Sequence, residues 1–198
     1  MAGSASIAAV GRSIVRLLNH CFEDAQPVPS HRTQAVLART PDFEESQVQT
    51  ALGNHALSVF LYRVDFNKAM RAAWSAAGAV EGRAHLALDL HYLLTPWSDN
   101  AEHEHLILGH TMQCLEETPI LSGPLLEPTG DWAVGEGLQL VLEEIPTDAL
   151  MRTFDSLPMD YRLSVPYLAR VLRLDGRTAH PEPPVRTYVG GLVPEPQR

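Results

Sequence analysis

The chain has 198 residues, of which 45% are hydrophobic and 20% charged, and its formal net charge is −9. This length and composition fit one globular domain with a sizeable core. Lys68 is the single lysine, and an acidic chain without clustered basic residues is a poor nucleic-acid binder, because phosphate contacts need such clusters. No stretch reaches the length of a membrane span, so we expect neither nucleic acid nor membrane as a partner.

The N-terminal segment predicts a helix from about Ser4 to Phe22, with Ser4 and Ser6 as candidate caps. Its apolar residues recur at helical spacing: Ile7, Val10, Ile14, Leu17, Leu18 and Cys21. Arg12 and Arg16 interrupt the apolar run, so the segment does not read as a signal peptide and a cytoplasmic location is expected. Cys21 and Cys114 each lie in an apolar helical pattern, which predicts two buried free thiols in a reducing compartment.

Two segments precede the strongest signal of the chain. Residues 34–39 predict a short strand, and residues 42–54 predict a loop with one helical turn. Residues 57–64 are apolar on both faces, which is typical of a strand covered on both sides. Residues 66–83 form either a long Ala- and Gly-rich connection that a partner orders or a short helix over 67–74, and both readings stay open.

The clearest element is the stretch from Ala84 to Trp97, which alternates strictly. One face is apolar and the other is mixed: Leu86, Leu88, Leu90, Tyr92 and Leu94 against His85, Ala87, Asp89, His91, Leu93 and Thr95. This period of two predicts a central or near-central strand that packs its leucine face on the core. Pro96 lacks an N–H and is expected to end the ladder.

The remaining chain predicts two helices and two strands. A helix capped by Asp99, with Glu102 as its capping-box partner, runs to about Glu117, and a Pro/Gly loop over 119–130 follows. A strand at 138–142, a short helix from Thr147 and a strand at 165–174 come next. The fold class is therefore α/β (α+β), with a single mixed sheet of about five strands and helices packed on it. We expect a domain over residues 1–175 and a Pro-rich extended tail over 176–198.

Asp89 and His91 share one strand face with His85, and a further ligand could come from His103, His105 or His110. The helical histidines do not show the i, i+4 pair with which a helix grips zinc, so a hydrogen-bonded polar cluster is the favoured reading. No nucleophile, base and oxyanion donor assemble in the sequence. We therefore expect no catalytic residue, metal ligand or cofactor. A small metal-dependent enzyme using Asp89 and His91, and a cytoplasmic cargo or assembly adaptor, are kept as alternatives.

Four segments carry a resemblance to a known family: residues 58–64 (SVFLYRV), 86–97 (LALDLHYLLTPW), 119–123 (PILSG) and 161–167 (YRLSVPY). Together they resemble the tail-terminator (cap) family of phage-tail-like extracellular contractile injection systems, of the antifeeding prophage and Photorhabdus virulence cassette type. The resemblance covers roughly residues 5–175. It implies a tail-terminator-like fold and a structural protein without catalysis or cofactor.

The same resemblance implies the partners. Such proteins form a six-fold ring at the baseplate-distal end of the tube and sheath and stop polymerisation there, in a particle that can be released from the cell. Large side chains flanked by small residues or prolines are what a subunit contact uses. We therefore predict that Phe66, Trp74, Tyr188 and Val189 are interface residues.

Overall fold

The computed structural model describes residues 2–70 and 83–179 of the chain. The helices are α1 (Ser6–Asp24), α2 (Glu45–Ala51), α4 (Ala101–Glu117) and α5 (Thr147–Asp155). The strands are β1 (Gln34–Ala38), β2 (Ala56–Phe66), β3 (Arg83–Trp97), β4 (Ile120–Ser122), β5 (Gly137–Leu142) and β6 (Val165–Ala179). Short 3-10 turns lie at Thr40–Phe43, Gly123–Leu125 and Pro128–Gly130.

Within these described residues the strands form one six-stranded sheet in the order β1-β2-β3-β6-β5-β4. β1 pairs with β2 in parallel, and the other pairs of neighbouring strands are antiparallel. The expected α/β class and single mixed sheet are confirmed. The strand beyond the expected five is β4, a three-residue edge strand inside the segment predicted as a Pro/Gly loop.

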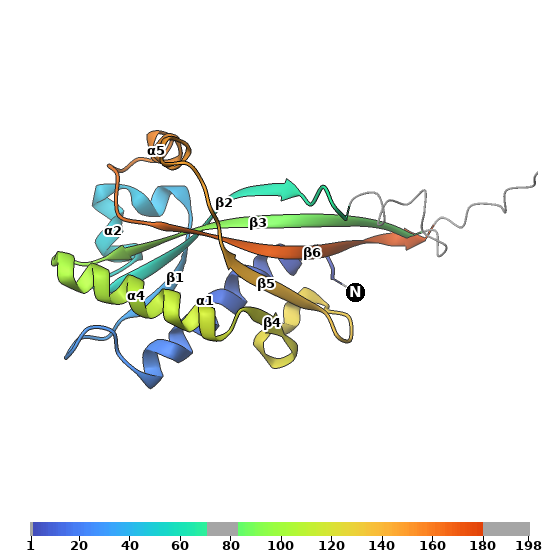
Figure 1. The fold of residues 1–198 in the computed structure, drawn as a ribbon, viewed down its shortest axis with the longest axis horizontal. Helices are drawn as coiled ribbons and strands as arrows, with labels where there is room; N and C mark the ends of the chain where they lie inside the picture. The colour runs from blue at the N-terminus through green and yellow to red at the C-terminus, as the bar shows by residue number, and fades with distance from the viewer. Residues whose placement is uncertain (1, 71–82, 180–198) are drawn as a thin grey trace, which may run out of the picture.

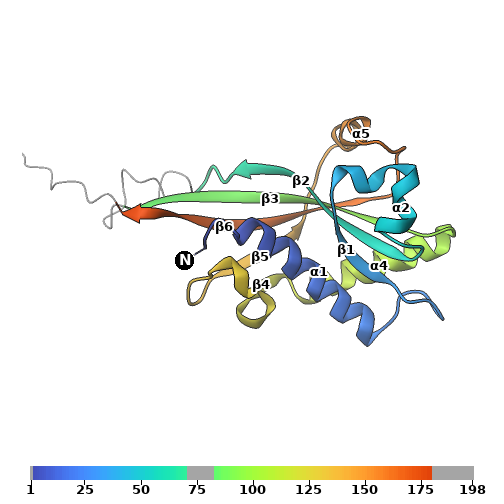
Figure 2. The ribbon, with the colours of Figure 1, turned by 180° about the vertical axis from the view of Figure 1, so that it is seen from behind.

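The predicted central strand is β3, which lies between β2 and β6 in the sheet. Leu88, Leu90, Tyr92 and Leu94 point into the main core, as the alternation predicts. α1 and α4 lie side by side on that face of the sheet (Figures 1 and 2). The ladder continues one residue past Pro96, because Trp97 still pairs with Ala56 of β2.

α1 packs closely on the sheet because Gly11 has no side chain. A Cβ atom at Gly11 would lie 2.9 Å from Cδ1 of Leu37 on β1, so a larger residue would push the helix outward. The expected serine caps of α1 are wrong, since Ala5 is its N-cap and no side chain bonds there. The cap of α4 is Asn100 and not Asp99: Oδ1 of Asn100 accepts the Glu102 N–H at 2.8 Å.

A second, smaller core covers the opposite face at one end of the sheet. It consists of Ala38, Phe43, Leu52, Ala56 and Trp97, beneath α2 and the turn before it. β2 is therefore covered on both sides over Ala56–Val59, as expected, but it is exposed from Arg63 onward. Figure 1 shows α2 and α5 at this end only, so the other ends of β2, β3 and β6 extend past them.

The expectation of two free buried thiols is wrong. The Sγ atoms of Cys21 and Cys114 are joined in a disulfide that links α1 to α4 across 93 residues of sequence. Both residues face the interface between the two helices, where each apolar stripe meets the sheet. Each cysteine taken alone resembles an ordinary buried residue, so the helical pattern did not reveal the pair.

The last strand is longer than the sequence indicates. β6 continues past Leu174 to Ala179, which pairs with Arg83 at the start of β3. The expected domain boundary at residue 175 thus falls inside a strand. The tail over 180–198, and the alternative helix over 67–74 beyond Met70, lie outside the described residues. No helix in the described part of the chain is long and apolar enough to cross a membrane.

Removing part of the Leu90 side chain tests the central position of β3. Leu90 is 0% exposed, so Leu90→Ala is expected to lower the free energy of unfolding by about 2–5 kcal/mol. Leu86→Ala is the matched control, because Leu86 lies on the same face of the same strand but is 37% exposed. Urea unfolding of both variants measures the two losses. Equal losses would contradict the position of the core along β3.

Removing the disulfide tests the link between α1 and α4. We expect the double variant Cys21→Ala, Cys114→Ala to lose about 2–4 kcal/mol of unfolding free energy, because the unfolded chain is no longer cross-linked. Urea unfolding of the native chain and of the double variant, both without reductant, gives the loss in free energy of unfolding. The native chain in reductant is the control, since it keeps both side chains and loses only the bond. Unchanged stability of the native chain on full reduction would show that the link contributes nothing.

Candidate functional site

Of the four predicted interface residues, the structure places one. Phe66 is the last residue of β2, lies opposite Leu88 of β3 and is 52% exposed. Trp74, Tyr188 and Val189 lie outside the described residues, so their role stays a prediction. Phe66 lies at the end of the sheet that extends away from α2 and α5 (Figure 1).

Other apolar side chains are exposed at the same end of the sheet. Val64 lies opposite Leu90, and Leu86 lies opposite Leu174 of β6. Directly opposed residues of antiparallel strands share a face, so Val64, Phe66 and Leu86 continue the face that carries the core leucines. We call these three residues the strand-end patch. Exposed apolar side chains that continue a core face are typical of a surface that another subunit covers.

β6 has an edge that is only partly paired in the described residues. β5 pairs with β6 as far as Arg170, and the strand runs on to Ala179. Between Arg170 and Ala179 the N-terminal segment uses one backbone group of β6: the Asp175 N–H donates to the Ala2 carbonyl at 3.0 Å. Backbone groups on a sheet edge can pair with an added strand. The described structure therefore offers an edge for strand addition next to the strand-end patch.

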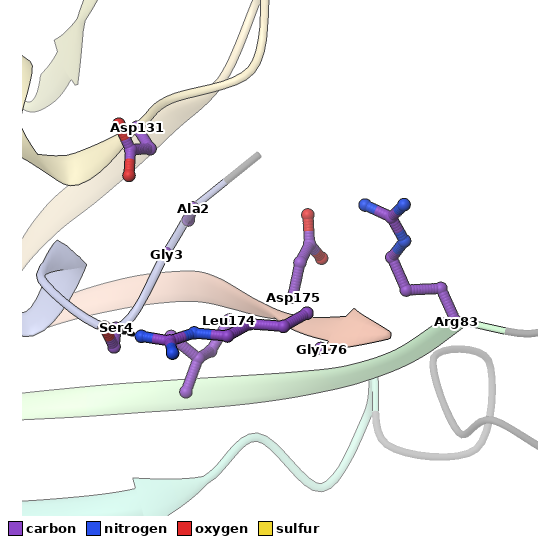
Figure 3. Close-up of a pocket in the computed structure, with 9 residues that line it drawn as sticks. Ala2, Gly3, Ser4, Arg83, Asp131, Leu174, Asp175 and Gly176 are labelled. Atoms are coloured by element: carbon purple, nitrogen blue, oxygen red, sulfur yellow. Dashed lines mark hydrogen bonds between the residues drawn. The ribbon is translucent and has the colours of Figure 1, made fainter. Parts of the chain in front are cut away.

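A shallow pocket lies at this edge, between the N-terminal segment and the ends of β3 and β6 (Figure 3). Ala2 and Gly3 run beside β6, and the Gly3 N–H donates to the Gly130 carbonyl at 3.1 Å. Nδ1 of His85 lies 2.5 Å from Oδ1 of Asp175, whose side chain is nearly buried. These contacts hold the N-terminus and β6 in a fixed arrangement, and they place His85 away from any shared metal site.

The second face of the sheet carries the polar cluster expected around His91. Nδ1 of His91 lies 2.8 Å from Oε1 of Glu143, and Nη2 of Arg63 donates to the same carboxylate at 3.2 Å. The Tyr62 hydroxyl donates to Oε2 of Glu143 at 3.1 Å. Burial and then the Glu143 carboxylate raise the pKa of the Tyr62 phenol to about 12, so it remains a donor at neutral pH.

The residues of the alternative metal site do not converge. Asp89 and His91 line one shallow pocket, but Asp89 accepts from Nδ2 of Asn67 at 3.0 Å while His91 contacts Glu143. On α4, Nε2 of His110 lies 3.4 Å from the Cys21 carbonyl oxygen, and the His105 side chain is exposed. Each side chain thus has its own surroundings, and no observation in the described chain favours the enzyme alternative built on Asp89 and His91.

The structure instead gathers histidines that the sequence analysis did not combine. His55 lies just before β2, Asp99 precedes α4 and His103 is in the first turn of α4. One ligand atom from each lies within 4.8 Å of the others. His31, from the segment between α1 and β1, contacts His55, with the ring centroids 4.2 Å apart and the ring planes tilted by 38°. Motif spacing cannot find this group because its members come from three separate segments.

Comparison with known proteins then gives a family and a fold. The family model described as the Pvc16 N-terminal domain matches residues 9–187. Comparison with curated proteins gives no match.

Two solved structures are similar to this chain over nearly all of its length. One is the sheath/tube terminator of PVC, an extracellular contractile injection system, in its extended state: identity is 18%, the TM-score is 0.55, and the match covers 96% of this chain and 64% of that one. The other is the tube terminating cap of the anti-feeding prophage: identity is 18%, the TM-score is 0.52, and the match covers 94% of this chain and 60% of that one. The chain thus spans less than two thirds of either protein.

Proposed function

The chain belongs to the Pvc16 N-terminal domain family, and on this premise we propose that it is a structural cap that ends polymerisation of the tube and sheath of a contractile injection system. The observation that carries the proposal is the agreement between the family match over residues 9–187 and the shared fold of two proteins named as terminators. Because both are longer than this chain, any role of their additional residues is outside the proposal.

A terminator needs one surface that binds the last ring and must not offer a second surface on which the next ring can grow. The open edge of β6 past Arg170 and the strand-end patch lie at one end of the sheet, while α2 and α5 cover the other end. This asymmetry supports a function in which the two ends of the subunit differ: one end binds tube or sheath, and the other faces away. Strand addition at the β6 edge would supply direction as well as affinity.

The proposed assembly is a six-fold ring of this chain at the baseplate-distal end of the particle. Ring closure needs a heterologous contact, in which two different surfaces of the same subunit meet and the rotation closes. The strand-end patch and the β6 edge lie at the same end of the sheet, and a neighbour that meets either of them with a different surface of its own would make such a contact. The proposal assigns no catalysis to the chain. The side chains of the Asp89/His91 alternative have separate hydrogen-bond partners, and these contacts support a structural role for them.

Deleting the gene is the direct test of length control. Particles from the deletion strain are expected to have irregular lengths or no ordered distal end, because nothing stops addition of sheath and tube rings. Electron micrographs of purified particles give the length distribution. Complementation with the native gene is the control and should restore a narrow distribution. Uniform particles of native length from the deletion strain would rule out the terminator role.

Substitution of Phe66 tests the proposed contact surface. Because Phe66 is about half exposed, Phe66→Ser should leave the isolated chain folded while weakening the contact with its neighbour. In the complemented deletion strain, this variant is expected to give a broader length distribution than the native gene. Leu106→Ser is the matched control, since Leu106 is 42% exposed on α4, away from the strand-end patch and the β6 edge. A native distribution from Phe66→Ser, or a broad one from Leu106→Ser alone, would place the contact elsewhere.

A further inference from the structure

The geometry points to a binding site for a divalent transition-metal ion, with Zn²⁺ as the best fit, formed by His55, Asp99 and His103 and completed by His31. The site lies outside the surfaces used in the proposed function. We assign it a structural role, because it joins separate segments of the chain. Imidazole nitrogen with one carboxylate is a donor set that suits Zn²⁺ and similar ions.

The distances are close to those of a coordination shell. Zn²⁺ binds histidine nitrogen and carboxylate oxygen at roughly 2.0–2.2 Å, which places tetrahedral ligand atoms roughly 3.3–3.6 Å apart. The three ligand atoms of His55, Asp99 and His103 lie within 4.8 Å of one another, so small side-chain rotations bring them into range. The ring of His31 lies 5.9 Å from that of His103 and 4.2 Å from that of His55, where it can supply the fourth ligand.

A second, independent observation concerns the Nδ1 atom of His103. This nitrogen is shielded from solvent and makes no hydrogen bond with the rest of the described chain. A buried ring nitrogen without a partner loses its hydration and gains nothing in return, which structures normally avoid. A metal ion bonded to this nitrogen would remove that penalty.

Hydrogen bonds around the cluster already hold the backbone and the side chains of these residues in position. The Gln34 N–H donates to the His55 carbonyl at 3.3 Å, which fixes the segment before β2 against the start of β1. Nδ1 of His55 lies 3.3 Å from Oγ of Ser98, the kind of outer contact that orients a ligating imidazole. The Ser98 hydroxyl also donates to Oδ1 of Asp99 at 3.4 Å, so one hydroxyl contacts two of the ligands.

The local charges are compatible with a cation. The N-terminus of α4 carries a partial positive charge that disfavours a metal, but Glu102 in its first turn and Asp99 before it are negative, while Glu104 is paired with Arg162 at 3.1 Å.

The consequence is a cross-link at one end of the sheet. The segment between α1 and β1, the turn before β2 and the junction of β3 with α4 would be held by one ion. This is the end of the sheet where Ala56 pairs with Trp97, opposite the strand-end patch. A bound ion would therefore stabilise the covered end of the subunit and leave the proposed contact surface free.

Calorimetric titration of Zn²⁺ into the full chain tests the site. The chain is used without a polyhistidine tag, with its disulfide intact and after treatment with a chelator. We expect one Zn²⁺ per chain, and at least about tenfold weaker binding in each of His55→Gln and His103→Gln. His105→Gln is the matched control, because His105 is exposed on the same helix, and its affinity should equal that of the native chain. Unchanged affinity in either ligand variant, or no binding by the native chain, would overturn the site.

A thermal measurement on the native chain gives a readout that does not depend on the variants. At a free Zn²⁺ concentration 100 times the dissociation constant, the melting temperature is expected to rise by about 5–10 °C. Ca²⁺ at the same concentration should leave it unchanged, since Ca²⁺ prefers oxygen ligands. An equal rise with Ca²⁺ would show general binding of cations to an acidic surface and would contradict a histidine site.

Discussion

The fold depends on burying one face of β3. Leu88, Leu90, Tyr92 and Leu94 stand on that face, and both α1 and α4 pack against it. The burial is continuous only where the two helices lie, so the sheet has a covered part and an extended part (Figures 1 and 2). Because the helices are also joined by the Cys21–Cys114 disulfide, the covering layer acts as one unit on the sheet. The exposed end of the sheet follows from this arrangement.

The extended part of the sheet makes the two ends of the subunit different. Past the register shifts in the β2–β3 and β3–β6 pairings, Val64, Phe66 and Leu86 still lie on the face of the core leucines, where nothing in the described chain fully covers them. In the same region β6 runs past the end of β5 and leaves part of its edge for another strand. A monomer gains little from such features, whereas a subunit in an ordered array uses them for contact and register. The proposed cap function rests on this physical asymmetry together with the family.

The sequence predicted most of what local pattern controls and little of what depends on distant pairing. Strict alternation located β3 and its core face, and the quoted segments led to the family that the comparisons confirm. The Cys21–Cys114 bond was missed because each cysteine fits its own helical stripe and the partner is 93 residues away. β4 is too short to show a period, and the His55, Asp99 and His103 group comes from separate segments. The helix cap is Asn100 and not the expected Asp99. Either residue type can cap a helix, and which one does so depends on the path of the chain out of β3.

The most direct test of the central claim is an electron cryo-microscopy reconstruction of the baseplate-distal end of the intact particle. The account predicts a closed ring of this chain at that end alone, with the strand-end patch and the β6 edge past Arg170 covered by neighbouring subunits. The covered end of the sheet, beneath α2 and α5, should face away from the tube and sheath. Density for this chain along the length of the particle, or a distal end that lacks it, would contradict the account.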